Sequence, residues 1–258
     1  MPLDRREFLN AAALGVVAGA LPLRILGAPA AGRTIRAVAF DAFPIFDPRP
    51  VFGLAERVFP GRGTELAAAW RSRQFEYQWL RALGGRYADF RQATEDALVF
   101  AARSLGLDLT AGQRAQLMNA YLQLRAWPDV PAALASLRNA GLRLGLLSNF
   151  TSALLDAGIR NAGLSGVFEH VLSTDAIRSY KPDPRAYELG TEAFGLAKEE
   201  ILFAAFAGWD VAGAKWFGYP TFWVNRAGAP DEQLGVAADG VGRDLNALVA
   251  FVGVGGPR

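Results

Sequence analysis

Cysteine is absent from this sequence of 258 residues, and histidine occurs only once, at position 170. Without cysteine the chain forms no disulfide, binds no metal through thiolates and has no thiol nucleophile. A single histidine also excludes histidine-rich metal sites and leaves little room for chemistry that needs a histidine base. We expect His170 itself to be a surface or satisfied side chain, because its neighbours predict a helix end that leads into a strand.

An excess of charge of one sign is also lacking. The 27 Lys and Arg side chains are balanced by 25 Asp and Glu side chains, for a formal net charge of +2. The basic residues are scattered along the sequence, so nucleic acid is not an expected partner. Hydrophobic residues make up 52% of the chain, which is enough for a sizeable core. The length allows one large domain, or a core domain with a smaller second domain.

The first 31 residues have the parts of an export signal in the right order. Arg5 and Arg6 precede an apolar stretch at 11–23, and Ala28-Pro29-Ala30 then places small residues where a signal peptidase cleaves. Paired arginines here are typical of twin-arginine signals. The apolar stretch is short for a membrane span, so we expect a periplasmic or otherwise exported protein without stable membrane anchoring after cleavage. An N-terminal anchor or a chance basic helix is the alternative.

Apolar periodicity divides the remaining chain into two kinds of segment. The run at 36–40 ends in Asp41, as in a buried parallel strand that delivers a polar residue at its carboxyl end. Helical periodicity dominates 51–127, and strands alternate with helices from Pro128 onward. The pattern predicts an α/β protein with a Rossmann-like parallel sheet core and a helical cap domain. The predicted boundaries are 34–47 with 128–253 for the core, and 48–127 for the cap.

Polar side chains stand where the predicted strands end. Ligand sites of parallel sheets lie beyond the carboxyl ends of the strands. We therefore expect a candidate nucleophile, a hydroxyl, an amide, a cation and a second acid to meet at one edge of the sheet. Singly, each has a plainer explanation as a helix cap or a surface charge, and Asp210 in particular is a candidate N-cap for the helix that follows it. These side chains belong to Asp41, Ser148, Asn149, Lys181 and Asp210.

The order of four of these residues resembles the motif order of the haloacid dehalogenase superfamily. Longer stretches are similar to the type II L-2-haloacid dehalogenases, and the similarity runs from Arg36 to about Ala250. The resemblance implies the Rossmann-like fold with a helical cap, and it favours a homodimer formed through that cap. The stretches that carry it are Phe59-Pro60-Gly61-Arg62-Gly63, Trp70-Arg71-Ser72-Arg73-Gln74-Phe75-Glu76-Tyr77-Gln78-Trp79-Leu80-Arg81, Gly85-Arg86-Tyr87-Ala88-Asp89-Phe90, Tyr180-Lys181-Pro182-Asp183 and Phe217-Gly218-Tyr219-Pro220-Thr221-Phe222-Trp223-Val224-Asn225-Arg226.

The resemblance implies a reaction in two steps. Asp41 would displace halide from C2 of a short 2-haloacid, and water would hydrolyse the resulting ester to the 2-hydroxy acid. Lys181 would hold Asp41 ionised, and Asp210 would help to activate water. The expected partner is thus a small haloacid, and no cofactor is expected. The family positions for substrate binding match Arg71 and Asn149 for the halide, Ser148 for the carboxylate, and Phe75, Phe90 and Trp209 for an apolar wall. Tyr187 also matches a family position, although a half-buried helix aromatic explains it equally well.

Phe43 separates dehalogenase chemistry from phosphatase chemistry. Phosphatases of the superfamily carry a second Asp two positions after the nucleophile, which protonates the leaving oxygen and helps to hold magnesium. Phe43 occupies that position here and does neither. We therefore expect a site without metal, with Phe43 among the substrate-binding residues, and a magnesium-dependent phosphatase is the disfavoured alternative.

Two loops depart from the family pattern. The family follows its nucleophile with an aromatic residue and then Gly-Thr, whereas this chain has Pro44 in a loop one residue shorter. Proline fixes its own φ and lacks a backbone donor. Ala205 and Ala207 replace a Ser and an Asn that orient the lysine and the hydrolytic water, and such losses commonly cost about 10- to 100-fold in activity. Two hypotheses stay open: a working (S)-2-haloacid dehalogenase with an altered pocket, or a catalytically impaired relative that binds small acids in the periplasm.

Overall fold

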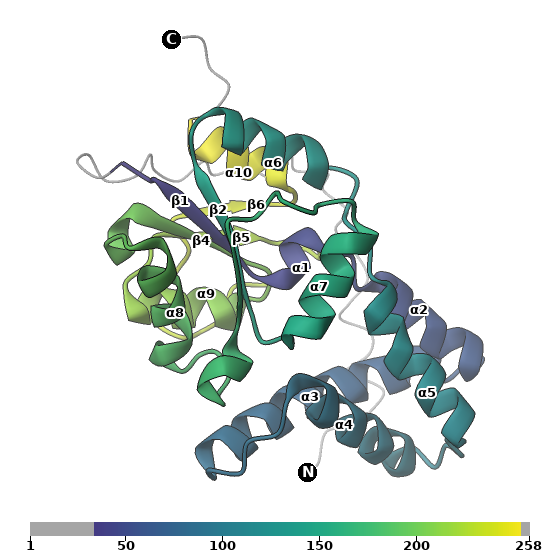
Figure 1. Ribbon diagram of the computed structural model, residues 1–258. Helices are drawn as coiled ribbons and strands as arrows, with labels where there is room; N and C mark the ends of the chain where they lie inside the picture. Colours follow the sequence, from purple (N-terminus) through teal and green to yellow (C-terminus); the bar gives the residue numbers. More distant parts are fainter. Residues whose placement is uncertain (1–33, 254–258) are drawn as a thin grey trace, which may run out of the picture.

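A single parallel sheet of six strands organises the protein, whose computed structural model describes residues 34–253 (Figure 1). The predicted export signal at 1–31 lies outside these residues. The strand order is β3-β2-β1-β4-β5-β6, and every neighbouring pair is parallel. The strands are β1 (Ala37–Phe40), β2 (Arg143–Ser148), β3 (His170–Ser173), β4 (Ile201–Ala205), β5 (Thr221–Val224) and β6 (Gly240–Gly242). The predicted α/β fold with a Rossmann-like sheet is confirmed.

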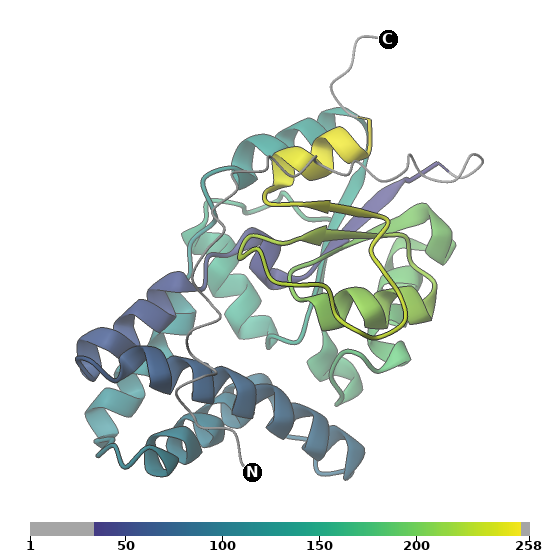
Figure 2. The ribbon, with the colours of Figure 1, turned by 180° about the vertical axis from the view of Figure 1, so that it is seen from behind.

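Alternate residues of each strand pack under different layers of helices. Val38 and Phe40 of β1 belong to the core beneath α6, α7 and α10, whereas Ala37 and Ala39 belong to the core beneath α8 and α9. Figures 1 and 2 show these helices on the two faces of the sheet. Because both faces are covered there, the central strands β1 and β4 are apolar and buried at every position rather than alternating. The helices are α6 (Val130–Asn139), α7 (Ser152–Asn161), α8 (Pro184–Phe194), α9 (Gly208–Phe217) and α10 (Leu245–Phe251).

Four further helices, which we call the cap helices, lie together beyond the sheet (Figure 1). Their two connections to the sheet run side by side. Phe46 and Ala126 form an antiparallel bridge, and the Asp47 amide donates to the Arg125 carbonyl at 2.8 Å. The cap helices are α2 (Arg49–Val58), α3 (Gly63–Leu83), α4 (Phe90–Ser104) and α5 (Ala111–Asn119), followed by a 3-10 turn at Ala120–Gln123. They fall within the segment predicted as the cap domain, although the domain boundaries themselves stay a prediction.

Three hydrogen bonds hold the far end of the cap helices against the core. The indole of Trp79 on α3 donates to the Lys181 carbonyl at 3.1 Å. The Tyr87 hydroxyl donates to Asp175 at 2.6 Å. The Tyr180 hydroxyl donates to the Ala88 backbone carbonyl at 2.6 Å. These bonds place one face of α3 over the carboxyl ends of the strands, where the predicted polar residues lie.

The sequence periodicity missed β6 and misplaced the start of α9. Strand β6 is a Gly-Val-Gly segment, which no strand pattern predicts; an added Cβ at Gly240 would lie 2.6 Å from the ring of Phe251. Helix α9 begins at Gly208 and not at Val211, and its N-cap is Ala207. Asp210 therefore lies inside the first turn of α9, so its explanation as an N-cap is wrong.

Two surface features bear on expectations from the sequence. The His170 ring lies partly buried on β3 and packs edge-on against Phe194, with 5.0 Å between ring centroids. Its Nε2 lies 3.4 Å from Glu169 Oε1 and has no hydrogen-bond partner among residues 34–253. On α3 the side chains of Leu80 and Leu83 are exposed to solvent. The homodimer through the cap stays a prediction. Within residues 34–253 no helix has the length and apolar character that crossing a membrane requires.

A partly buried ion pair ties the segment after β1 to the rest of the core. The Arg226 guanidinium donates to both carboxylate oxygens of Asp129 at 2.9 Å and to the Pro44 carbonyl at 2.8 Å. The Leu245 amide at the start of α10 donates to Asp129 as well. Burial alone would raise the pKa of Asp129, but these hydrogen bonds outweigh it and lower the pKa.

We expect Arg226→Met to destabilise the fold by about 3–5 kcal/mol, because Asp129 then remains partly buried without its partner. The measurement is urea unfolding of the two proteins at neutral pH. A lowered pKa means that the stabilisation is present above the ordinary Asp range and is lost as the pH falls through the folded value. The gap between wild type and variant should thus shrink in acid, and equal stabilities at neutral pH would contradict this account.

Candidate active site

Asp41 stands directly after β1, at the start of a short helix, α1 (Ala42–Ile45). Its carboxylate caps that helix, since Oδ2 accepts the Phe43 amide at 3.4 Å. Its own amide donates to the Ala204 carbonyl at 3.0 Å, which continues the pairing of β1 with β4. Only 15% of the Asp41 side chain is exposed. The carboxylate is therefore fixed at the sheet edge with one oxygen only weakly engaged.

The Lys181 ammonium lies between two carboxylates. Nζ donates to Asp41 Oδ1 at 2.8 Å and to Asp210 Oδ2 at 2.6 Å, and the side chain is 1% exposed. Burial alone would lower the pKa of Lys181, but the charges of Asp210 and Asp41 raise it. The Lys181 backbone is held from both sides, because its amide donates to Asn149 Oδ1 at 3.0 Å and its carbonyl accepts the Trp79 indole. A permanent cation thus stands against the candidate nucleophile.

Asp210 is fully buried behind Asp41. Its Oδ1 accepts the Tyr187 hydroxyl at 2.7 Å, while Oδ2 accepts Lys181. Burial raises the pKa of Asp210 to about 6, an increase that Lys181 opposes and that the charge of Asp41 supports. Tyr187 does not line the pocket, although the sequence placed it among the substrate-binding residues. It is buried beneath the pocket on α8 and positions Asp210, which corrects that expectation.

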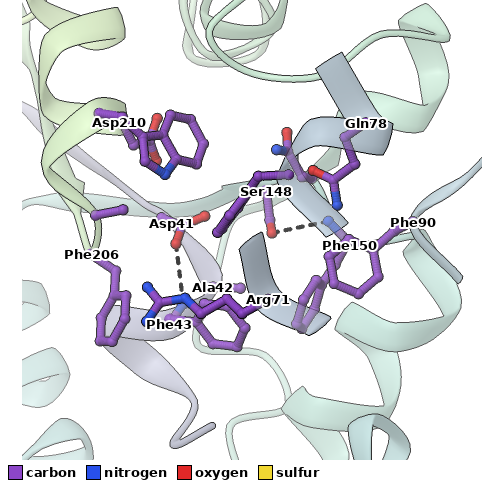
Figure 3. A pocket seen from close by; sticks show the side chains of 14 residues that line it. Asp41, Ala42, Phe43, Arg71, Gln78, Phe90, Ser148, Phe150, Phe206 and Asp210 are labelled. Carbon is purple, nitrogen blue, oxygen red and sulfur yellow. Dashed lines mark hydrogen bonds between the residues drawn. The ribbon is translucent and has the colours of Figure 1, made fainter. Parts of the chain in front are cut away.

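A cavity of about 30 Å³ opens over Asp41 between the sheet edge and α3 (Figure 3). Nine of the side chains expected from the sequence line it, and Lys181 contacts its floor through Asp41 and Asp210. The nine are Asp41, Phe43, Arg71, Phe75, Phe90, Ser148, Asn149, Trp209 and Asp210.

Several hydrogen-bond donors of this cavity have no acceptor among the described residues. The buried indole nitrogen of Trp209 is one. Arg71 reaches the cavity from an exposed position on α3 without any ion pair in residues 34–253, and partial loss of water lowers the pKa of its guanidinium. The Ser148 oxygen accepts the Phe150 amide at 3.1 Å, which leaves its proton free to donate. An arrangement with more donors than acceptors suits a small anion.

The rest of the cavity wall is aromatic. Phe43 packs edge-on against Phe150 with 5.3 Å between ring centroids, and it also contacts Phe206 at 5.5 Å. Phe75 packs against Trp209 at 5.3 Å on the opposite side. Such a wall keeps water away and strengthens the ionic contacts inside it.

The two loops that depart from the family pattern leave the Lys181 contacts in place. The Pro44 carbonyl accepts a hydrogen bond from Arg226, which fixes the short helix α1 after Asp41. Ala205 is buried at the end of β4, and Ala207 caps α9 without a side-chain hydrogen bond. Lys181 is oriented by its two carboxylates instead of by a Ser or an Asn. No polar side chain at positions 205 and 207 is available to orient a water molecule.

No group of three or more His, Asp or Glu side chains lies close enough to hold a metal ion anywhere in the described part of the chain. Asp41 and Asp210 are the two carboxylates nearest to one another at the sheet edge, and both are bound by the Lys181 ammonium. The acidic pair is thus already neutralised in part by a side chain.

Four further residues line the cavity that the sequence did not single out: Ala42, Gln78, Phe150 and Phe206. Gln78 follows Arg71 and Phe75 at spacings of seven and three residues, which puts all three on one face of α3. This helical spacing from two predicted site residues could have identified Gln78 as a cavity residue from the sequence. Phe150 and Phe206 each come one or two residues after a strand, and nothing in their local pattern distinguishes a cavity wall from a core side chain.

Comparisons with known proteins agree with this arrangement. The model of the haloacid dehalogenase-like hydrolase family matches residues 19–218. The chain is 46% identical over 216 residues to an (S)-2-haloacid dehalogenase of Pseudomonas sp. (strain YL), covering 83% of this chain and 93% of that protein. It is 41% identical over 223 residues to the haloacetate dehalogenase H-2 of Moraxella sp. (strain B), covering 86% and 100%.

A solved structure of a related protein also superposes on most of this chain. The L-2-haloacid dehalogenase from Xanthobacter autotrophicus with chloropropionic acid covalently bound superposes with a TM-score of 0.78 at 37% identity, covering 86% of this chain and 100% of that one.

Asp210 should take up a proton as the pH falls through about 6, because burial raises its pKa well above that of an ordinary aspartate. Tyr187→Phe removes a hydrogen bond to the ionised form, so the pKa should rise further. Difference infrared spectroscopy of the carboxyl band against pH measures both values, with Asp210→Asn as the control that lacks the transition. A midpoint near pH 4, or one that does not move in Tyr187→Phe, would contradict the burial argument.

Proposed function

The chain belongs to the haloacid dehalogenase-like hydrolases, and on that premise we propose that it hydrolyses short 2-haloacids to 2-hydroxy acids through an ester on Asp41. The observation that carries the proposal is the pairing of Asp41 with the buried Lys181 ammonium at 2.8 Å, under a cavity lined by unpaired donors. The relatives are named for (S)-2-haloacids and for haloacetate. These names support a substrate with a short carbon chain.

In the first step Asp41 displaces the halide. Oδ1 is held by Lys181, so Oδ2 is the freer oxygen, and it forms a bond to C2 while the carbon–halogen bond breaks and the halide leaves with the bonding electrons. The leaving halide needs no proton. Arg71 and Asn149 receive it, and Ser148 donates to the substrate carboxylate. The aromatic wall keeps the nucleophile poorly hydrated, which raises its reactivity toward carbon.

In the second step water attacks the carbonyl carbon of the Asp41 ester. Asp210, whose pKa is about 6, is ionised at neutral pH and takes the proton from that water. The bond between the carbonyl carbon and the ester oxygen then breaks, and the leaving alkoxide takes the proton of the newly formed carboxyl group. This releases the 2-hydroxy acid and restores the Asp41 carboxylate, and Asp210 returns its proton to solvent. The covalent chloropropionic acid in the Xanthobacter protein supports an intermediate of this kind.

A second candidate function follows from Ala205 and Ala207. With no side chain there to orient water, the ester would form and then persist, and the protein would act as a binder of small acids rather than as an enzyme. We favour the enzyme, because Asp41, Lys181 and Asp210 keep their mutual hydrogen bonds without the missing side chains.

Wild-type protein should release halide from (S)-2-chloropropionate over many turnovers, and Asp41→Asn should reduce the rate by at least about three orders of magnitude, since the nucleophile is lost. Halide release against time measures the rate, and intact mass measures any acyl adduct in the same samples. Release of a single equivalent with a lasting adduct would support the binding protein. Release that is unchanged in Asp41→Asn would overturn the proposed nucleophile.

We also propose that residues 1–31 direct export, on the strength of Arg5, Arg6 and the small residues at 28–30. Expression in a bacterium with a twin-arginine pathway should yield periplasmic protein whose mass lacks the first 31 residues, and Arg5→Lys with Arg6→Lys should leave the precursor in the cytoplasm. The measurement is cell fractionation with intact mass. Uncleaved wild-type protein in the cytoplasm would end this proposal.

A further inference from the structure

Gln78 is the one buried amide of α3 that lines the cavity. Its side chain is completely buried, and neither its nitrogen nor its oxygen has a hydrogen-bond partner among residues 34–253. It lines the cavity with Asp41 and Ser148. Leaving such a group unpaired in the interior costs free energy. A buried, unpaired amide directed into a cavity is expected to meet a ligand.

Gln74, one turn earlier on the same helix, is a buried amide whose hydrogen bond lies within the protein, and it provides a comparison for Gln78. It is almost as buried as Gln78, yet its amide donates to the Thr94 hydroxyl, which in turn donates to the Phe90 carbonyl. The contrast between two buried amides on one helix therefore lies in their surroundings. Gln74 faces α4, and Gln78 faces the cavity.

The position of Gln78 indicates which part of a substrate it meets. Figure 3 shows its amide on the same side of the cavity as Ser148, while the Arg71 guanidinium extends toward the opposite side, near Phe206. A carboxylate has two oxygens and about four acceptor sites, more than the single Ser148 hydroxyl satisfies. A second neutral donor beside Ser148 complements that demand.

We infer that Gln78 is a substrate-binding residue whose amide nitrogen donates to the carboxylate of the haloacid, alongside Ser148. The inference rests on the proposed function for the identity of the substrate. The site thereby selects acids that carry a free carboxylate over neutral esters and amides of the same shape. A carboxylate keeps its charge through both chemical steps, so this contact stabilises ground state and transition state equally and acts on KM rather than on kcat.

The experiment compares Gln78→Met with Gln74→Met in the full chain. Methionine keeps length and bulk but removes the amide. We measure KM and kcat for chloroacetate, the dissociation constant for propionate by calorimetry, and the Tm of each protein. Propionate carries no halogen, so its binding reports on Gln78 whether or not the protein turns over.

Gln78→Met should raise KM and the propionate dissociation constant by about tenfold, the scale of one hydrogen bond to a charged group, with kcat within about twofold of wild type. Its Tm should equal or exceed that of wild type, because an unpaired buried amide has been removed. Gln74→Met should instead lower Tm by several degrees, because Thr94 loses its hydrogen bond with Gln74. It should leave the propionate dissociation constant unchanged.

Propionate binding that is equal in wild type and Gln78→Met, or absent from both, would overturn the inference, as would a Tm loss matching that of Gln74→Met. Weaker propionate binding in Gln78→Met without halide release by wild type would instead uphold the role of Gln78 and reject the proposed dehalogenation.

Discussion

The buried contact of Lys181 with Asp41 and Asp210 is the interaction on which the site depends. Three charges are withdrawn from water at the edge of the sheet, and each would be costly there alone. Asp41 is delivered by β1, Asp210 by the first turn of α9 after β4, and Lys181 by the loop after β3. Strands β1 and β4 are adjacent and β3 is separated from β1 by β2, so the carboxyl ends of these parallel strands must lie at the same edge of the sheet for the three groups to meet. The parallel sheet and its register are therefore what positions the chemistry.

The surroundings of this triad explain why it favours attack on carbon. The Lys181 ammonium engages only one of the two Asp41 oxygens strongly. The aromatic wall limits hydration of the other oxygen, and Arg71 offers an unpaired cation to an anion that departs. The same arrangement is less complete for the second step. Ala205 and Ala207 contribute no polar side chain, so under the proposed mechanism the orientation of the water as well as its deprotonation falls to Asp210.

Much of the site could be predicted from the sequence, because strand ends in a parallel sheet converge. Ser148 is the last residue of β2, and Asp41, Lys181 and Asp210 follow β1, β3 and β4. Local pattern could not show which side of a residue faces the cavity. Tyr187 was expected to touch substrate, but its hydroxyl meets Asp210 from beneath. Gln78 lies within one of the stretches that carry the family resemblance, but its significance depends on the absence of a hydrogen-bond partner, which only the packing of α3 against the core reveals. Strand β6 lacks any apolar alternation and is held in place by the rings that surround Gly240.

The central claim is that Asp41 attacks the substrate directly and that water later attacks the carboxyl group of Asp41. One turnover in water labelled with heavy oxygen, with enzyme in excess over (S)-2-chloropropionate, tests this most directly. The account predicts that the label enters the Asp41 carboxylate, detected by mass spectrometry of the peptide containing it, while the hydroxyl of the product stays unlabelled. Label in the product with none in Asp41 would mean that water attacks C2 itself, and the ester mechanism would be wrong.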